Sequence, residues 1–190
     1  MLAAGGKKAK AKGANVLPPD NDHPAKKTSP GSSADWARSR YAFALEAVKD
    51  AWAGAVDEAK ASDIALSILT HWSIETGSGA GELNNNPGNI NAMGEPFVWV
   101  HDVDGTWHKQ RAFDTIHDGA AAYVNLLRAS RYAGAAQLLA NNPTSSDWYI
   151  KLGHEGWFDP TAAKSTWDAA RSMYESRRKL LEQYAEGDES

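Results

Sequence analysis

Glu75 is the residue whose surroundings are best suited to chemistry. It follows Trp72 and Ile74 at the end of an apolar segment, and Gly77 and Gly79 directly after it expose the backbone. A carboxyl group held against apolar side chains resists ionisation, because desolvation disfavours its charged form. A carboxylic acid that stays protonated near neutral pH can donate a proton to a leaving oxygen, as in glycosidic bond cleavage. The alternative interpretation is an ordinary solvated glutamate at a helix end.

Hydrophobic spacing predicts a helix that positions Glu75. This helix begins near Ser62 and turns Ile64, Ile68 and Trp72 inward, and the glycines beyond Glu75 end it. An earlier helix is predicted after Asp35, a plausible N-cap. Its apolar residues recur at helical spacing: Trp36, Tyr41, Leu45, Val48, Trp52 and Val56.

A β-hairpin is predicted after a turn-rich stretch at residues 84–90. Residues 97–100 and 106–109 alternate aromatic and β-branched side chains around an Asp-Gly turn, which is a strong short-range signal for a hairpin. Helical patterns resume in three further segments and in a last one that starts at Asp159 and Pro160. The three segments are residues 116–127, a short helix around 138–139 and another at 148–152. The predicted fold class is mainly α (α+β), with a small β-hairpin lobe.

Composition divides the chain at residue 34. Residues 1–34 contain six lysines and two acids and have no aromatic residue, whereas residues 35–190 contain 14 basic and 22 acidic residues and all eight tryptophans. The net charge of −4 is therefore a tail of +4 and a body of −8. Small residues, Pro, Gly and Lys bury too little apolar surface to offset a chain entropy of about 1–2 kcal/mol per residue. We expect residues 1–34 to be a flexible basic tail or anchor and residues 35–190 to be one folded domain.

Several classes of protein are excluded by composition. No apolar stretch approaches the roughly 18–20 residues of a membrane span, and the first residues lack the apolar core and cleavage site of a secretory signal, so the Sec route is not expected. The absence of cysteine excludes disulfides, thiolate metal ligands and a thiol nucleophile. The six histidines lack zinc-ligand spacing and no phosphate-binding loop occurs, so we expect neither metal nor cofactor. An acidic body is also a poor partner for nucleic acid.

Short motifs follow one another along the body. They are Glu75-Thr-Gly-Ser-Gly79, Asn85-Asn86-Pro-Gly-Asn-Ile90, the hairpin at 97–109, Phe113-Asp-Thr-Ile116, Arg131-Tyr132 and Gly156-Trp-Phe-Asp-Pro160. In this order they resemble the family 73 bacterial glucosaminidases of the flagellar-hydrolase type, within the lysozyme-like superfamily of peptidoglycan-cleaving enzymes. The asparagine motif also resembles phage-associated lytic enzymes. The resemblance covers about residues 60–183.

The resemblance implies a lysozyme-like fold that binds peptidoglycan glycan strands. Glu75 would be the general acid that protonates the glycosidic oxygen between N-acetylated sugars, a role typically worth about 10²–10⁴-fold in rate. Asn85 and Asn86 would close the floor of the cleft, and both sugar contact and a purely structural turn stay open for them. Gly88 is expected there because the turn needs a positive φ.

Many of these enzymes carry a second carboxylate on the hairpin, a few residues before its turn glycine. Counting back from Gly105, this position is His101, a departure from the pattern, with Asp102 next to it. Asp102 is the candidate base, since Asp104 is expected to shape the turn. Without a second carboxylate two routes stay open. One is inversion by a water in a wide cleft, the geometry of carboxyls roughly 6.5–9.5 Å apart, and the other is attack by the sugar's own 6-hydroxyl, as in lytic transglycosylases.

The aromatic residues fit a sugar cleft, because flat rings offer stacking faces to sugars as well as core area. Trp99, Trp107 and Trp157 are candidates for substrate contact from their positions, and the resemblance adds Tyr123. Four other tryptophans lie on helical stripes and are expected in the core: Trp36, Trp52, Trp72 and Trp167. Aromatic and amide contacts must carry binding, because a body of charge −8 does not attract a substrate with carboxylates.

The leading hypothesis is an enzyme, a muralytic glycosidase that cleaves the β-1,4 bonds of peptidoglycan. The alternatives are a lytic transglycosylase that uses the same Glu75, a catalytically weak lysozyme-like module that binds the cell wall, and a glycosidase for chitin or a similar polymer. The missing Sec signal and the basic tail lead us to expect association with a phage virion or a contractile injection assembly that acts on the cell wall.

Overall fold

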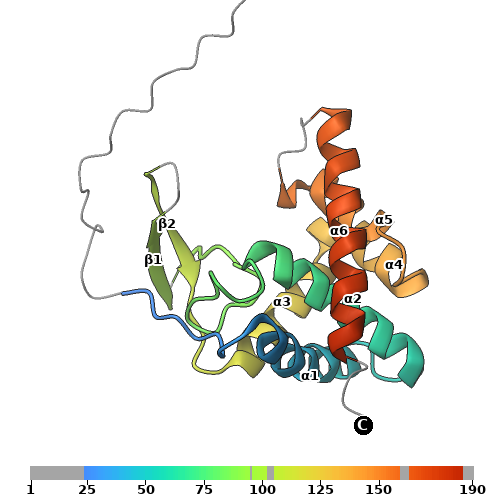
Figure 1. The fold of residues 1–190 in the computed structure, drawn as a ribbon, viewed down its shortest axis with the longest axis horizontal. Coiled ribbons are helices and arrows are strands. Elements are labelled where there is room, and N and C mark those ends of the chain that lie inside the picture. Colours follow the sequence, from blue (N-terminus) through green and yellow to red (C-terminus); the bar gives the residue numbers. More distant parts are fainter. Residues whose placement is uncertain (1–23, 95, 102–104, 159–162, 186–190) are drawn as a thin grey trace, which may run out of the picture.

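Helices make up most of the structure, and a β-hairpin stands at one side of them (Figure 1). The structure is a computed structural model that describes residues 24–94, 96–101, 105–158 and 163–185. Its elements are α1 (Ser33–Ala51), α2 (Glu58–Glu75), β1 (Phe97–His101), β2 (Trp107–Arg111), α3 (Ile116–Arg128), η1 (Ser130–Tyr132), α4 (Ala133–Asn141), α5 (Asp147–Leu152), η2 (Gly153–Trp157) and α6 (Lys164–Ala185). The predicted fold class, mainly α with a small hairpin, is confirmed.

Helix α2 lies at the centre of the helical part. Every residue from 64 to 73 is buried, so the helix is covered on all sides, as expected of a core helix. Helices α1, α4 and α6 pack against it, and α6 crosses it in Figure 1. The helix begins four residues before the predicted Ser62, because the side chain of Asp57 caps it by accepting a 2.8 Å hydrogen bond from the Lys60 N–H. It ends at Glu75, as predicted.

Helix α1 begins at a different cap from the one predicted. The N-cap is Ser32, whose hydroxyl accepts a hydrogen bond from the Asp35 N–H at 3.2 Å. Asp35 is the third residue of the helix, and its carboxylate accepts hydrogen bonds from the Ser32 hydroxyl and N–H in return. These bonds, together with the Arg38 guanidinium, hold the pKa of the Asp35 carboxyl below its usual value. Asp35 therefore completes a capping box three residues beyond the cap.

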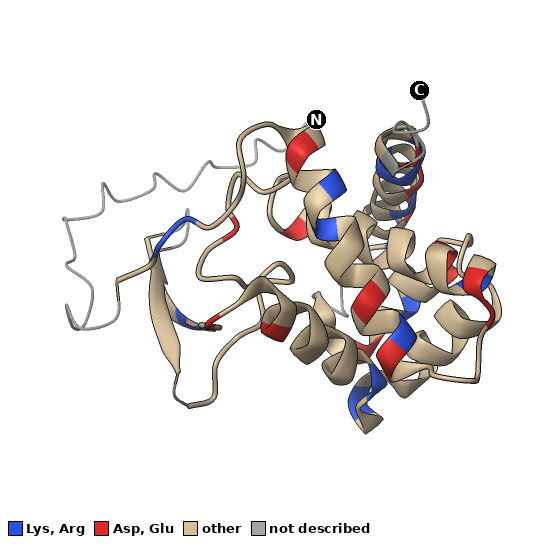
Figure 2. Cartoon of the chain, turned by 90° about the horizontal axis from the view of Figure 1, so that it is seen from below, with Lys and Arg blue, Asp and Glu red and all other residues tan. Residues whose placement is uncertain are grey.

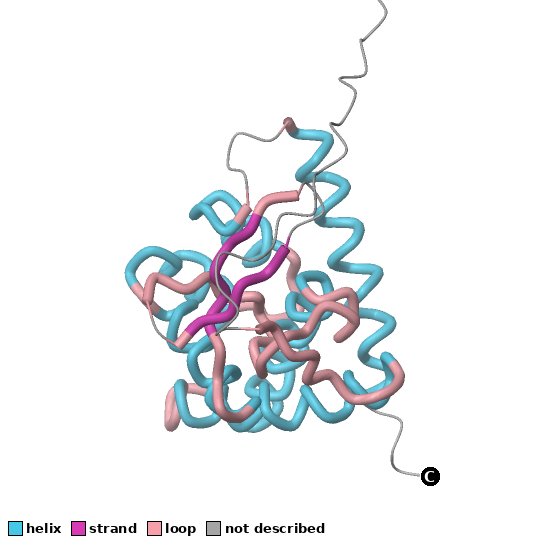
Figure 3. The backbone as a smooth tube through the Cα atoms, turned by 90° about the vertical axis from the view of Figure 1, so that its left-hand side faces the viewer, coloured by secondary structure: helices cyan, strands magenta, loops and turns pink. Residues whose placement is uncertain are grey.

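The predicted hairpin is confirmed, with Phe97 opposite Arg111 and His101 opposite Trp107. It faces the viewer in Figure 3. The loop before it runs alongside β2, since the Arg111 N–H donates to the Ile90 carbonyl at 2.9 Å. The predicted turn residues 102–104, and the predicted helix start at 159–160, lie outside the described residues.

Part of the segment predicted as a tail is packed on the body. The Lys26 N–H donates to Asn84 Oδ1 at 2.6 Å, and the Asn84 N–H donates to the Lys26 carbonyl at 2.8 Å. The Thr28 N–H donates to the Glu82 carbonyl at 3.3 Å. Residues 26–28 thus pair with the loop after α2, and Pro24 forms a bridge with Trp99 of β1. Residues 1–23 lie outside the described residues.

A buried ion pair fixes this loop to α1. Glu82 is fully buried, and its carboxylate accepts hydrogen bonds from Arg40 Nε at 2.9 Å and from Trp36 Nε1 at 2.8 Å. The Thr28 hydroxyl also donates to it at 3.2 Å. Arg40 is 5% exposed, and it additionally donates to the Thr28 carbonyl at 3.0 Å. A buried charge is tolerated only when it is paired and hydrogen-bonded, as this one is.

The core is rich in aromatic rings. Trp36 and Trp72 are fully buried, as predicted, whereas Trp52 and Trp167 are only half-buried. Trp148, which the sequence placed on a short helix, is also fully buried and donates from Nε1 to the Tyr174 hydroxyl at 2.8 Å. No helix among the described residues is long and apolar enough to cross a bilayer.

Removing the charge of Glu82 tests the buried ion pair. Glu82→Gln leaves the Arg40 guanidinium buried without a counter-charge, so the free energy of unfolding should fall by about 3–5 kcal/mol in urea denaturation. Asp168→Asn is the matched control, because it breaks the exposed Lys164–Asp168 pair and should change stability by less than about 1 kcal/mol. Equal effects of the two substitutions would contradict the role given to Glu82.

Candidate active site

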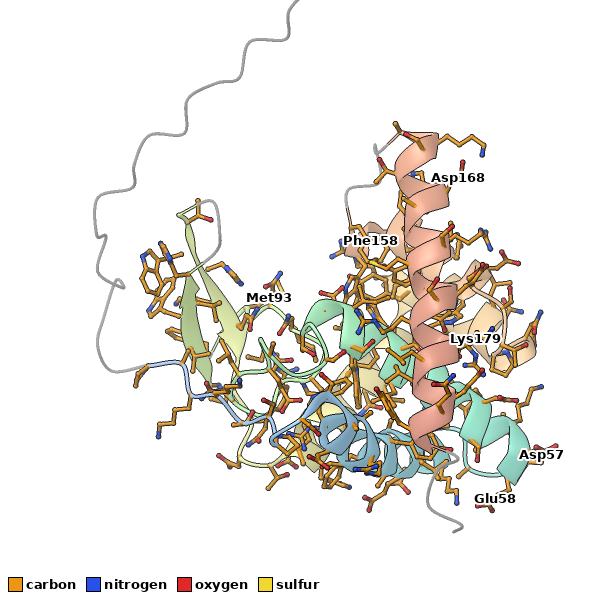
Figure 4. All side chains as sticks on the ribbon, viewed as in Figure 1. Asp57, Glu58, Met93, Phe158, Asp168 and Lys179 are labelled. Atoms are coloured by element: carbon orange, nitrogen blue, oxygen red, sulfur yellow. The ribbon has the colours of Figure 1, made fainter. Side chains whose placement is uncertain are left out.

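A cavity of about 800 Å³ opens beside the C-terminal end of α2. Figure 4 labels Met93, one of its lining residues, which lies between the hairpin and the end of α2. The lining comes from the end of α2, the loop at 89–94, strand β2, the α3–η1 region and the segment 156–157. Its residues are Glu75, Asn89, Ile90, Asn91, Met93, Gly94, His108, Gln110, Arg111, Leu126, Arg131, Tyr132, Gly156 and Trp157.

Glu75 is the only carboxylate among the described residues that line the cavity. Its side chain is 23% exposed, and its Oε1 lies 3.0 Å from His71 Nε2 and 3.2 Å from Trp157 Nε1. Its main-chain carbonyl accepts a 2.6 Å hydrogen bond from Asn89 Nδ2. No hydrogen bond to Oε2 is found among the described residues. The carboxyl is thus held at Oε1, while Oε2 has no protein partner among the residues that the structure describes.

The structure brings Trp157 to Glu75, although 82 residues separate them in the chain. Trp157 ends η2, a single wide helical turn in which Gly156 has a φ of 96°. Arg131 donates to the Gly156 carbonyl at 3.0 Å and so holds this turn. The indole also packs against Tyr132, with ring centroids 5.3 Å apart. Among the predicted substrate contacts, Trp157 therefore lines the cavity with Glu75. The other five predicted contacts do not line it: Asn85, Asn86, Trp99, Trp107 and Tyr123.

Tyr123 lies behind the cavity and does not line it. Its side chain is fully buried, so the predicted direct contact with substrate has no exposed surface to use. Its hydroxyl instead forms a hydrogen bond with Nδ1 of His71, which is also fully buried. Burial, reinforced by the negative charge of Glu75, raises the pKa of the Tyr123 phenol well above its usual value. Tyr123 therefore contacts the acid only through His71.

Asn85 and Asn86 hold the loop together and do not line the cavity. Asn86 is fully buried, and its amide donates to the carbonyls of Ile90 and Arg111 at 3.0 and 3.1 Å. The amide of Asn85 donates to the carbonyls of Phe113 and Asp114, each at 3.0 Å. The sequence left sugar contact and a structural turn open for these two residues. In the structure both side chains form the turn.

Two other asparagines of the same loop, Asn89 and Asn91, line the cavity and were not predicted. Asn89 has a φ of 49°, a left-handed conformation that asparagine tolerates better than most residues. Its Oδ1 is buried and has no hydrogen-bond partner among the described residues. The sequence shows a run of asparagines, but only the loop's path decides which of them face the cavity.

Gly88 is required for a reason different from the one predicted. Its φ is not positive, and the left-handed positions are instead Asn84, Asn85 and Asn89. A Cβ at Gly88 would stand 2.2 Å from Cδ2 of Tyr123, so the ring packs directly on the loop backbone. On the other side of this loop, a Cβ at Gly119 would stand 1.9 Å from the Asn85 carbonyl oxygen. The two glycines let the loop lie close against α3.

Trp99 does not line the cavity. Alternate residues of a strand point to opposite faces, so Trp99 and its partner Lys109 lie on the face opposite to the cavity-lining His108 and Gln110. Arg111, the last residue of β2, is on the same face as Trp99 but also lines the cavity. The ammonium of Lys109 lies 5.0 Å from the Trp99 ring centroid. Trp107, opposite His101, shares the same face as Trp99. The predicted base Asp102 lies outside the described residues.

The cavity carries positive charge that composition did not predict. Arg111 and Arg131 line it, and neither forms an ion pair with a carboxylate among the described residues. The Arg111 guanidinium lies 4.9 Å from the Phe113 ring centroid, and that of Arg131 lies 5.2 Å from the Tyr132 ring centroid. Acidic and basic residues are interspersed over the helices (Figure 2). The cavity lining holds two arginines and one glutamate, so the total charge of −8 does not describe it. The expectation that charge gives no help to an anionic substrate is therefore revised.

No group of three potential metal-ligating side chains is present among the described residues. The cavity as described offers a carboxyl group, amides, an indole, a phenol and two guanidinium groups. This is a set for acid–base chemistry on a polar substrate with apolar faces.

The fold is similar to that of a glycoside hydrolase domain. The solved structure of the glycoside hydrolase domain of FlgJ from Salmonella typhimurium superposes with a TM-score of 0.51 at 18% sequence identity, covering 83% of this chain and 95% of that one. The likeness confirms, at the level of fold, the resemblance drawn from the motifs. No protein-family model matches the chain, and no curated protein matches it by sequence.

The packing of Gly119 against the loop gives a prediction. Alanine normally stabilises a helix relative to glycine, by about 1 kcal/mol. In Gly119→Ala the added Cβ instead meets the Asn85 carbonyl, so we expect a loss of about 1–3 kcal/mol in thermal unfolding, as for other overpacked sites. Gly94→Ala is the control, since nothing lies within 4 Å of its Cβ position. An unchanged or raised melting temperature for Gly119→Ala would refute the close packing of loop and α3.

Proposed function

We propose that this protein is a peptidoglycan hydrolase, a muralytic glycosidase that cleaves β-1,4 bonds between N-acetylated sugars. The observation that carries this proposal is the geometry of Glu75, a part-buried carboxyl in a cavity of about 800 Å³ that the described residues hold at one oxygen only. The fold likeness to a glycoside hydrolase domain supports it.

In this proposal Glu75 acts as the general acid. Its Oε2 donates a proton to the glycosidic oxygen as the bond to the anomeric carbon breaks, which typically contributes about 10²–10⁴-fold to the rate. The rings of Trp157 and Tyr132 give apolar surfaces for the C–H faces of the sugars. Asn89, Asn91 and Gln110 supply amides for their hydroxyl and N-acetyl groups.

Glu75→Gln tests the acid directly. Glutamine keeps the size of the side chain and an oxygen acceptor but has no carboxylic proton, so clearing of purified peptidoglycan should slow by about 10²–10⁴-fold at an unchanged melting temperature. Glu46→Gln, an exposed residue remote from the cavity lining, is the control and should keep full activity. If Glu75→Gln clears peptidoglycan as fast as the wild type, Glu75 is not the acid. If neither the wild type nor the variant clears it, the result favours the alternative of a catalytically weak module that binds the cell wall.

The products distinguish hydrolysis from transglycosylation. A hydrolase leaves reducing ends, whereas attack by the 6-hydroxyl of the sugar leaves 1,6-anhydro ends. We expect reducing ends in mass spectrometry of the released fragments, with Asp102 retained as the predicted base. A product mixture made up of 1,6-anhydro fragments would replace the hydrolase proposal by the transglycosylase that uses the same Glu75.

The two arginines favour peptidoglycan over chitin as the substrate. Peptidoglycan carries free carboxylates on the stem peptides that are amide-linked to its lactyl groups, whereas chitin is neutral. Arg111 and Arg131 present guanidinium groups at the cavity without a carboxylate partner among the described residues, and a guanidinium binds a carboxylate with two parallel hydrogen bonds. We therefore propose that they contact the acidic groups attached to the glycan.

This proposal predicts a charge-specific effect of Arg131→Gln. The value of kcat/KM should fall by about tenfold more on peptidoglycan than on neutral chitin oligosaccharides, as for the loss of one charged hydrogen bond of about 1.5 kcal/mol, because the loss of the Arg131 hydrogen bond to the 156–157 turn affects both substrates alike. Arg128→Gln is the control, because that guanidinium lies 5.3 Å from the Trp52 ring centroid, away from the cavity lining. Parallel losses on both substrates would mean that Arg131 only holds the 156–157 turn.

Delivery by a virion or a contractile injection assembly stays a prediction. It rests on the basic residues near the N-terminus, and most of these belong to residues 1–23, outside the described residues.

A further inference from the structure

His71 stands one helical turn before Glu75 on the same side of α2. It is fully buried, and its Nε2 lies 3.0 Å from Glu75 Oε1. Its Nδ1 forms a hydrogen bond with the Tyr123 hydroxyl. Three side chains from α2 and α3 therefore form a continuous chain of hydrogen bonds that ends at the candidate acid.

The direction of these hydrogen bonds follows from Tyr123. Burial raises the pKa of its phenol, so the phenol keeps its proton. Its hydrogen-bond partner among the described residues is His71 Nδ1, which we assign as the acceptor. A neutral imidazole that accepts at Nδ1 carries its proton on Nε2. The Nε2–H then donates to Glu75 Oε1.

Aromatic rings enclose His71 and keep its orientation. The ring centroids of Trp157, Tyr149 and Trp148 lie 5.2, 5.5 and 6.0 Å from that of the imidazole. The close packing of these rings opposes rotation of the imidazole. Trp157, one of these enclosing rings, also donates its indole N–H to Glu75 Oε1.

We propose that His71, oriented by Tyr123, is a positioning residue that fixes which oxygen of Glu75 carries the acidic proton. Oε1 receives two N–H donors, from His71 and Trp157, and so takes the part of the carbonyl oxygen. The proton of the carboxylic acid then sits on Oε2, the oxygen without a protein partner among the described residues. This inference rests on the proposed function of Glu75 as general acid.

A pair of substitutions at His71 separates positioning from packing. His71→Gln can keep an N–H donor toward Glu75, whereas His71→Leu fills the space without one. We expect His71→Leu to lower kcat on peptidoglycan by about 10²-fold at an unchanged KM, as for a misplaced catalytic group, and His71→Gln to restore most of the loss. Equal kcat values for the two variants, or a loss that appears only in KM, would overturn the proposal.

Tyr123→Phe provides a second test that keeps the packing of the ring. Without the phenol, Nδ1 loses its donor, so kcat should fall, and the buried Nδ1 left without a partner should also lower the melting temperature. Tyr132→Phe is the matched control for the loss of a phenol. Because Tyr132 lines the cavity, this control is compared by the NMR resonances of the histidines and not by activity.

Nitrogen NMR of the wild-type protein reads the hydrogen bonds independently of activity. The resonances of His71 should show a neutral ring protonated at Nε2, and this form should be lost in Tyr123→Phe and retained in Tyr132→Phe. A His71 protonated at Nδ1 would overturn the proposal whatever the activity of Glu75→Gln. If Glu75→Gln is fully active while His71 shows the expected tautomer, the failure lies in the proposed function and not in the hydrogen-bond chain.

Discussion

The site depends on the buried ion pair between Glu82 and Arg40. Glu82 lies in the loop between α2 and the hairpin, and its carboxylate accepts hydrogen bonds from Trp36 and Arg40 of α1 and from Thr28 of the N-terminal segment. Burying this charge costs several kcal/mol, which the guanidinium and the added donors offset only in one arrangement. Three parts of the chain are thereby locked together, and the loop that forms one wall of the cavity has a fixed starting point.

From this point the loop is held mainly by its own amides. Asn86 bonds both Ile90 of the loop and Arg111 of β2, Asn85 joins the loop to the segment just before α3, and Gly119 allows α3 to come close. Asn89 then donates to the main chain of Glu75, so the same loop touches the last residue of α2. The cavity is therefore bounded by an irregular segment held by hydrogen bonds, and the acid lies at the junction of this segment with the central helix. Trp157 closes the arrangement from the opposite end of the chain.

The sequence was sufficient to predict elements whose signal is local. The apolar run before Glu75 predicted the end of α2, and the alternation around Gly105 predicted the hairpin. Contacts between distant segments left no such signal. Which face of the hairpin meets the cavity depends on tertiary packing, and so Trp99 was expected at the site while His108 and Gln110 were not. Glu82 looks like any surface acid in the sequence, and only the approach of Arg40 explains its burial. The sequence likewise gave no signal that Tyr123 contacts Glu75 only through His71. It also did not show that Arg111 and Arg131 line the cavity, because the net charge of −8 describes the whole body.

The central claim is that the glycosidic bond is placed at Oε2 of Glu75, the oxygen to which none of the described residues donates. The most direct measurement is a crystal structure of the Glu75→Gln variant with a bound peptidoglycan fragment. We predict a glycosidic oxygen within about 2.6–3.2 Å of the side chain at position 75, with a sugar ring against Trp157. A fragment bound elsewhere, for example on the outer face of the hairpin at Trp99, would contradict the account.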